Sequence, residues 1–235
     1  MNELYLSEAM IARAFWTELR STTRAQEAMV DVDTKIFPHS EMVGKSFPTQ
    51  TGSISRSSAE LIWLMARYFE PKRVAEVGTF IGRSTLSLYY GARQSLEFLA
   101  TCDYSYDTWH APAGDAQSKI RYFGKTPSQG MFQKLLDEGR KVDLFLLDGR
   151  ISVEDLGLIE QLATPNSVFI VDDFEGVEKG VANVVRLREK FPGLHLLTPD
   201  SELKNGWNDS HCLAVLIPTA NIRVTRQQRL PLGLM

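Results

Sequence analysis

The sequence predicts a doubly wound α/β fold with a mostly parallel sheet of seven strands. Over the last two thirds of the chain, short apolar runs alternate with segments of helical period, an order typical of parallel strands joined by helical crossovers. Three runs, 72–78, 141–149 and 167–174, are almost continuously apolar, as strands covered on both faces should be. The last two runs, 194–199 and 211–218, have a polar loop between them, which favours an antiparallel pair at the sheet edge.

The chain is expected to divide into a helical lid, a sheet domain and a tail. Within 1–52, apolar residues recur at the helical period over 3–30, whereas 31–52 contains two prolines and two glycines and is expected to be a broken loop or lid. The sheet domain is expected over 53–218 and a tail over 219–235. Strands are expected at 72–78, 95–103, 119–124, 141–149, 167–174, 194–199 and 211–218, and helices at 53–70, 82–93, 127–139, 152–163 and 175–191.

Composition and charge limit the kind of partner. Hydrophobic residues make up 43% of the 235 residues and the net charge is −3, so nothing favours a nucleic-acid partner. We see no signal peptide and no apolar run that could span a bilayer, so we expect no membrane partner. The two cysteines, Cys102 and Cys212, lie in apolar runs and are expected to be buried free thiols, which indicates a reducing compartment and a cytoplasmic protein.

The stretch AEVGTFIGRST places two glycines, Gly78 and Gly82, directly after the first strand of the sheet. A dinucleotide loop would have a third glycine where Phe80 stands, and Glu76 would repel a phosphate. The lysine that a nucleoside triphosphate loop requires is absent. A ligand that is cationic near this loop fits better, and S-adenosylmethionine (SAM) has an ammonium, a sulfonium and one small carboxylate.

The residues around this loop suggest how each part of SAM would be held. The two glycines would let the backbone come close, and the following helix start would hold the carboxylate by its free amides. Glu76 would attract the ammonium, directly or through water. Asp103, at the end of the second strand, would accept hydrogen bonds from both ribose hydroxyls.

These motifs carry a resemblance to a known family. AEVGTFIGRST and FLATCD are similar to the first two motifs of the class I SAM-dependent methyltransferases, over about residues 53–217. The pairing of FLLDG with FIVDDF resembles more particularly the metal-dependent O-methyltransferases of the catechol and macrocin types. The resemblance implies a Rossmann-like sheet, Ser84 by the methionine carboxylate and Gly124 beside the adenine. It also implies a divalent metal on three acids, Asp148, Asp172 and Asp173.

The expected cofactors are therefore SAM and a divalent cation, Mg²⁺. Three carboxylates converging on one cleft repel each other unless something positive lies among them, and Mg²⁺ prefers oxygen ligands. Alternatively, Asp172 caps the next helix and Asp173 is solvated. The expected cofactor-binding residues are Glu76, Gly78, Phe80, Gly82, Ser84, Asp103, Gly124 and Asp148.

The catalytic base cannot be carried over from the family. The positions that would hold it are occupied by Arg150 and Ile151. Asp148, His39 of the lid and Arg150 are the catalytic candidates, although Arg150 could instead bind an acidic substrate group or pair with Glu154. The missing base leaves N-methylation, a non-methylating use of SAM such as cyclisation or group transfer, and a binding protein on a degenerate fold as alternatives to O-methylation.

The loop 104–118 indicates the acceptor. It is long for a connection and carries two tyrosines, a tryptophan and a histidine, which suggests a small molecule, aromatic or a secondary metabolite. The rings could equally pack the loops together. A homodimer is compatible with the expected fold and function.

Overall fold

The computed structural model describes residues 8–20, 23–47, 52–174, 177–198 and 213–219. Their centre is a seven-stranded sheet in the order β3-β2-β1-β4-β5-β7-β6. Strand order reverses between β1 and β4, which is where an open α/β sheet binds its ligand. The strands are β1 (Arg73–Val77), β2 (Phe98–Asp103), β3 (Ile120–Gly124), β4 (Val142–Leu147), β5 (Ala163–Val171), β6 (Leu194–Leu197) and β7 (Ala214–Pro218).

The predicted mixed sheet is confirmed. Strands β1 to β5 pair in parallel, whereas β7 is antiparallel to both of its neighbours, β5 and β6. Strand β6 therefore forms the edge of the sheet, and β7, which follows it in the sequence, lies between β5 and β6. This makes the last two runs an antiparallel pair, as their short polar connection indicated.

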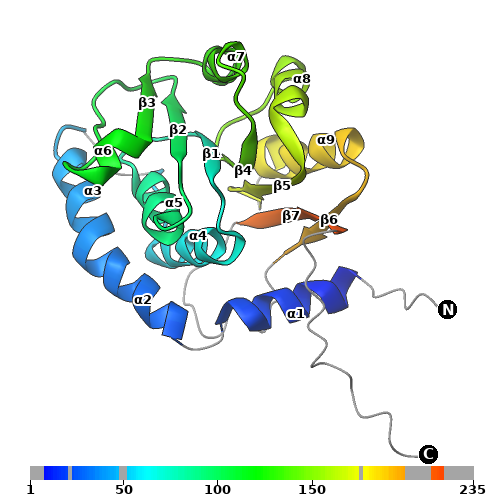
Figure 1. Cartoon of the computed structure of the whole chain (residues 1–235), viewed down its shortest axis with the longest axis horizontal. Coiled ribbons are helices and arrows are strands. Elements are labelled where there is room, and N and C mark those ends of the chain that lie inside the picture. The colour runs from blue at the N-terminus through cyan, green and yellow to red at the C-terminus, as the bar shows by residue number, and fades with distance from the viewer. Residues whose placement is uncertain (1–7, 21–22, 48–51, 175–176, 199–212, 220–235) are drawn as a thin grey trace, which may run out of the picture.

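Helices cover both faces of the sheet, as Figure 1 shows. Along β4 the side chains alternate between faces, so Leu144 and Leu146 enter one core while Phe145 and Leu147 enter the other. The first core lies against the helices before β2, and the second against the helices after β3. These helices are α1 (Glu8–Arg20), α2 (Thr23–Asp31), α3 (Phe37–Gly44), α4 (Arg56–Phe69), α5 (Arg83–Ala92), α7 (Ser128–Asp137), α8 (Val153–Leu162) and α9 (Ala182–Lys190), and the loop after β2 adds the short α6 (Asp115–Lys119).

The expectation of a broken loop over 31–52 is wrong for its first part. The chain stays helical from α2 through a π-helical turn, η1 (Val32–Ile36), into α3, and only 48–51 lie outside the described residues. Pro38 does not interrupt the helix because it lies in the first turn of α3, where its missing N–H is not needed. Gly44 is the last residue of α3 rather than part of a flexible lid.

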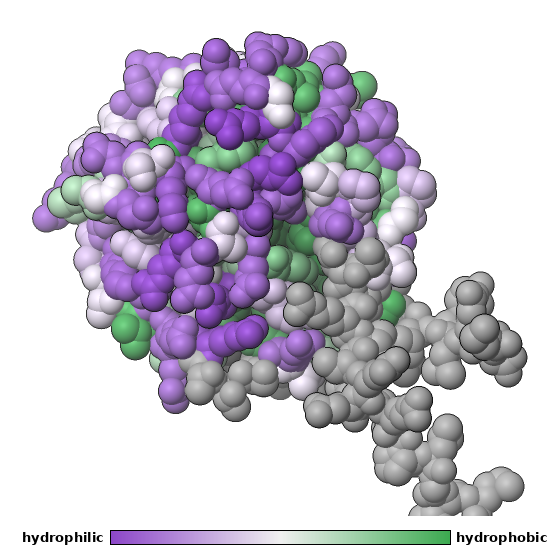
Figure 2. Space-filling model, in the orientation of Figure 1, coloured by the Kyte–Doolittle hydropathy of each residue, from purple (hydrophilic) through white to green (hydrophobic). Residues whose placement is uncertain are grey.

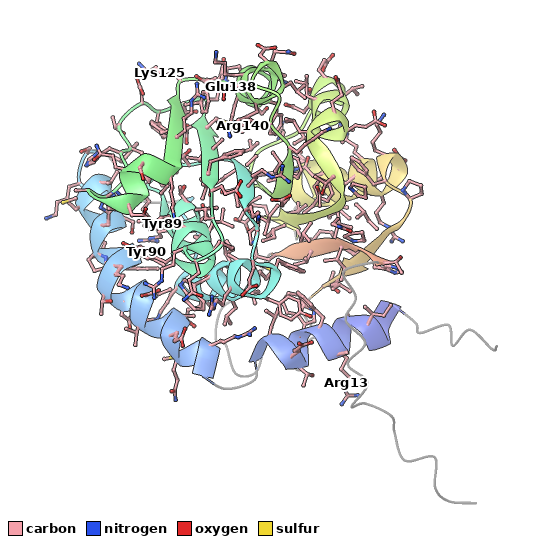
Figure 3. The ribbon with its side chains drawn as sticks, in the orientation of Figure 1. Arg13, Tyr89, Tyr90, Lys125, Glu138 and Arg140 are labelled. Atoms are coloured by element: carbon pink, nitrogen blue, oxygen red, sulfur yellow. The ribbon has the colours of Figure 1, made fainter. Side chains whose placement is uncertain are left out.

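The surface away from the sheet's carboxyl edge carries ordinary polar groups. Figure 2 shows mostly hydrophilic residues over the face seen in Figure 1. At the amino ends of the strands, Glu138 accepts a hydrogen bond from Arg121 and lies 3.8 Å from Arg140 (Figure 3), so these charges satisfy one another. Among the described residues, no helix combines the length and apolar character that crossing a membrane requires.

Candidate functional site

A cavity of about 570 Å³ opens outside the carboxyl ends of the parallel strands. It lies at the reversal of strand order between β1 and β4, where an open α/β sheet binds its ligand. Its walls come from the ends of β1 and β2 and from the loops that follow β3 and β4. The lining residues are Val77, Gly78, Cys102–Ser105, Thr126–Gln129, Gly149–Ser152 and Asp155.

Asp103 is the acid that the structure holds most firmly at this cavity. Its Oδ2 accepts a hydrogen bond from the backbone N–H of Phe80 at 2.8 Å, and its Oδ1 accepts from the N–H groups of Ser105 and Tyr106 at 2.8 and 3.0 Å. Phe80 has a φ of 45°, a conformation that costs a non-glycine residue about 1–3 kcal/mol and is held only where its surroundings enforce it. The glycine loop and the end of β2 are therefore one rigid unit.

The glycines of the loop are required by close contacts. Gly78 has a φ of +103°, and a Cβ there would lie 3.1 Å from the Cβ of Asp148. Gly82 has a φ of +80°, and a Cβ there would lie only 1.9 Å from Nε1 of Trp109. The first glycine thus lets β1 and β4 approach each other, and the second lets the loop after β2 lie over the start of α5.

Glu76 lies beneath the loop rather than in the cavity. It is completely buried, and its Oε2 accepts hydrogen bonds from Thr85 and Thr101 at 2.5 and 2.6 Å. Burial raises the pKa of Glu76 from 4.5 to about 7, while nearby hydroxyl groups oppose that rise. In this arrangement Glu76 ties β1 to β2 and α5, and its expected contact with an ammonium stays a prediction.

The family resemblance also implied Ser84 and Gly124 as cofactor-binding residues, and the structure gives these two residues different surroundings. Ser84 is buried in the first turn of α5, close to the glycine loop. Gly124 pairs with Asp103 across β2 and β3, but a Cβ there would meet the carboxylate of Asp107 at 1.8 Å. Gly124 is therefore covered by the loop after β2, and the cavity wall beyond β3 begins at Thr126.

The acids expected to bind metal end the adjacent strands β4 and β5. Asp148 follows β4, while Asp172 and Asp173 follow β5. Burial raises the pKa of Asp148, and the negative charge of Asp172 adds to that rise. Asp148 and Asp172 are thus close enough to interact, as the parallel register of their strands requires.

The positive charge that these acids demand is supplied by a residue that the sequence reasoning missed. The ammonium Nζ of Lys179 donates to Oδ1 of Asp148 and to Oδ2 of Asp173, both at 2.5 Å. The two carboxylates raise the pKa of Lys179 against the opposing effect of burial, so the lysine stays charged.

Lys179 reaches the acids through an unusual piece of helix. It lies on the π-helical turn η2 (Val177–Val181), a form that occurs mostly as single turns and often at functional sites. Gly180 lets this turn approach the end of β5, because a Cβ there would lie 2.3 Å from the carbonyl oxygen of Asp173. Asp173 itself has a φ of 55°. The backbone thus has an uncommon conformation at both Lys179 and Asp173.

As arranged here, the three acids do not fit a divalent ion. A metal bound to Asp148 and Asp173 would occupy the space that holds the ammonium of Lys179. In the parts of the chain that the structure describes, no group of three or more His, Cys, Asp or Glu side chains has the geometry of a metal site. The expected Mg²⁺ therefore stays a prediction, and no catalytic step is derived through it.

The other two catalytic candidates make contacts of their own, and only Arg150 lines the cavity, whereas His39 does not. Nε2 of His39 lies 3.1 Å from the backbone oxygen of His110, and burial lowers the pKa of His39. Arg150 borders the cavity and pairs with Glu178 at 2.8 Å, so the expected pairing with Glu154 is wrong. The partner comes from η2 because that turn packs over the loop after β4.

The aromatic residues above the cavity mainly pack against one another. Phe47, Phe80 and Tyr106 form a cluster with ring centroids 4.7–5.5 Å apart. Trp109 is buried against Tyr122, whereas Tyr104 is 76% exposed and lines the cavity. Most of these rings thus fix the loops, as the alternative reading proposed. Cys212 lies outside the described residues; Cys102 is buried and free, as expected.

Two features of the sequence point to the residues that were missed. Lys179 is the first lysine after Lys141, and it directly precedes a glycine in the segment that follows the acidic pair. Asn183, four residues further on, bonds the backbone of Ile151 and Gly149 through its side-chain amide. The sequence therefore shows a single lysine shortly after the acidic pair. That this lysine contacts the acids depends on the π-helical turn.

Comparisons with known proteins show the fold. No family model and no curated protein sequence matches the chain. The SAH-bound methyltransferase PaMTH1 of Podospora anserina is 14% identical with a TM-score of 0.53, covering 93% of this chain and 99% of its own. An SAH-bound O-methyltransferase from Bacillus cereus is 13% identical with a TM-score of 0.54, covering 80% and 94%. The O-methyltransferase TomG of Streptomyces achromogenes, involved in tomaymycin synthesis and solved with SAM, is 15% identical with a TM-score of 0.52, covering 88% and 95%. The chain therefore has the fold of the class I SAM-dependent methyltransferases.

Proposed function

We propose that this chain is a SAM-dependent methyltransferase that acts on the oxygen of a small molecule. The observation that carries the proposal is the fixed carboxylate of Asp103 at the cavity rim, bonded to the glycine loop through Phe80. Oδ1 uses both of its lone pairs on Ser105 and Tyr106, whereas Oδ2 accepts one bond and keeps a further lone pair for a ribose hydroxyl. The cavity is also large enough for a nucleoside-sized ligand, since small-molecule pockets span about 300–1,000 Å³.

SAM would supply an activated methyl group, and the chain's own residues would bind and orient the reactants. The N-terminus of α5 would receive the methionine part, because no side chain caps it, while Gly78, whose N–H already donates to Cys102, would let the ligand come close to the backbone. Thr126–Gln129 and Gly149–Ser152 would enclose the base. The acceptor would approach near Asp148, which directly precedes Gly149 of the cavity wall. Holding two reactants in line supplies much of the rate of such a transfer.

Calorimetric titration of SAM tests the cofactor assignment. We expect Asp103→Asn to bind SAM about 10–100-fold more weakly, because hydrogen bonds to a charged group contribute about 1.5–3 kcal/mol each. Asp137→Asn, at the end of α7 and away from the cavity lining, is the matched control and should bind as wild type does. An affinity within about twofold of wild type for Asp103→Asn would reject the ribose contact.

The acceptor and the metal need a separate measurement. We propose a small molecule, aromatic or a secondary metabolite, since the exposed Tyr104 offers a flat surface beside the cavity. Product masses from SAM assays on a panel of phenols and amines would show whether oxygen or nitrogen gains the methyl group. The same assay in EDTA separates two roles of Asp148, Asp172 and Asp173: if they assist through a divalent metal, EDTA abolishes the activity and Mg²⁺ restores it, whereas acids that are neutralised by Lys179 leave the activity unchanged. Modification of protein or nucleic acid instead would refute the small-molecule assignment.

A further inference from the structure

The ion pair of Lys179 occupies the place where a divalent cation is expected in this fold. We propose that the ammonium of Lys179 is a built-in replacement for that cation, so that the chain works without a divalent metal. The proposal deepens the proposed methyl transfer and rests on it for the role of the site. The position of the lysine itself is independent of the reaction.

The contacts of the ammonium support this role. Lys179 bonds the acid after β4 and the second acid after β5, which are two of the three expected metal ligands. Its side chain is 26% exposed, and that of Asp148 is 17% exposed, so water screens this pair less than a surface pair. By contrast, Arg150 and Glu178 nearby are 71% and 84% exposed. The protein thus places a cation directly between Asp148 and Asp173.

The backbone is shaped to deliver this lysine. The π-helical turn η2 turns Lys179 back toward the sheet, and Gly180 packs where any side chain would collide with the backbone of Asp172 and Asp173. Asn183 then fastens the same segment to the loop after β4, through bonds to Ile151 and Gly149. A freely solvated lysine would need none of these features.

Charge balance gives the replacement a chemical meaning. One ammonium offsets one of the negative charges of the three acids, whereas a divalent ion would offset two. An ammonium also has three N–H groups, of which two are used here, so a third can donate to an acceptor oxygen. Lys179 would therefore orient a hydroxyl acceptor by a hydrogen bond, as a positioning residue.

Binding of Mn²⁺, followed by electron paramagnetic resonance, tests the replacement without any methyl transfer. Wild type should show no site with a Kd below about 1 mM, while Lys179→Met, which uncovers the acids, should bind at least about 30-fold more tightly. Lys179→Arg keeps a cation and should resemble wild type. Lys190→Met is the matched control, because Lys190 lies further along the same helical segment as Lys179 and pairs with Glu160 of α8. This variant should not create a site.

Two results would overturn the proposal. Equal Mn²⁺ binding by wild type and Lys179→Met would show that the lysine yields to metal, and no binding by a folded Lys179→Met would show that the acids are not a cation site. If Lys179→Met does not fold, wild type decides: a melting temperature raised by Mn²⁺, with the rise lost in Asp148→Asn, overturns the replacement. If the wild-type protein does not bind SAM in the calorimetric test, the proposed function is rejected. The Mn²⁺ measurements keep their meaning in that case.

Discussion

Glu76 shows how one buried side chain can link the cofactor loop to the pH dependence of the whole protein. Its carboxyl group lies under the glycine loop, accepting from Thr85 and Thr101, and it is shielded completely from solvent. An acid in that position is most stable with its proton. Because the raised pKa lies near neutrality, ordinary changes of pH alter its charge.

We expect the free energy of unfolding to fall as the pH rises through this range. The pKa of Glu76 is about 7 in the folded state and about 4.5 when unfolded, so the folded state holds the extra proton between these values. The stabilisation is complete below about pH 4.5 and is lost by about pH 7, a difference of up to about 3 kcal/mol. Urea unfolding of wild type and Glu76→Gln across this range would measure it.

The variant separates Glu76 from the other titrating groups. Glutamine keeps the size and one acceptor oxygen but cannot ionise, so the difference in stability between the two proteins should grow with pH and favour Glu76→Gln at pH 8. A difference that is constant with pH would show that Glu76 is not the titrating group. SAM must be absent, so that binding of the ligand adds no pH dependence of its own.

At the scale of elements, the close packing of α4 on α5 supports the loop from below. Gly91 in α5 allows this approach, because a Cβ there would lie 2.3 Å from the backbone oxygen of Trp63 and 2.9 Å from the Cβ of Ala66. The helix that receives the methionine part of SAM in our proposal is thus positioned by its neighbour. Moving α5 outward would also move the glycine loop at its start.

Gly91→Ala should therefore destabilise the protein by about 1–3 kcal/mol, the usual cost of overpacking a core. Gly157→Ala is the matched control, since Gly157 is also inside a helix but a Cβ there would meet nothing within 4 Å. That variant should gain about 0.5–1 kcal/mol from helix propensity. Denaturant unfolding of both variants makes the comparison, and equal stability of Gly91→Ala and wild type would contradict the packing argument.

At the scale of the whole molecule, binding of SAM should stabilise the fold. A ligand that binds only the folded state at 100 times its Kd contributes about 2.7 kcal/mol, which corresponds to a rise in melting temperature of about 5–10 °C for a protein of this size. Thermal unfolding with increasing SAM measures this rise, with NAD⁺ as the control ligand. A similar rise with NAD⁺ would indicate a dinucleotide site and contradict the interpretation of the glycine loop.

The sheet could be predicted from the sequence because its strands are short apolar runs bounded by polar or glycine residues. The helical continuation through 31–44 could not be predicted, because a proline usually interrupts a helix unless it lies in the first turn. Pro38 lies in the first turn of α3. The acids at the strand ends were predictable because parallel strands share one carboxyl edge. Lys179 was not, because its position depends on a π-helical turn and on the contact of Gly180 with the end of β5.

The insertion of β7 between β5 and β6 has a consequence for synthesis on the ribosome. Helix α1 packs on β6, and its Trp16 donates to the backbone of Thr198, which is made 182 residues later. At about 5–20 residues per second, the side of α1 that carries Trp16 waits about 10–40 s for this partner. Strand β6 must in turn wait for β7, its neighbour in the sheet. Until then Phe15 of α1 can pack on Tyr68 and Phe69 of α4, whereas the side of α1 that carries Trp16 stays uncovered in the nascent chain.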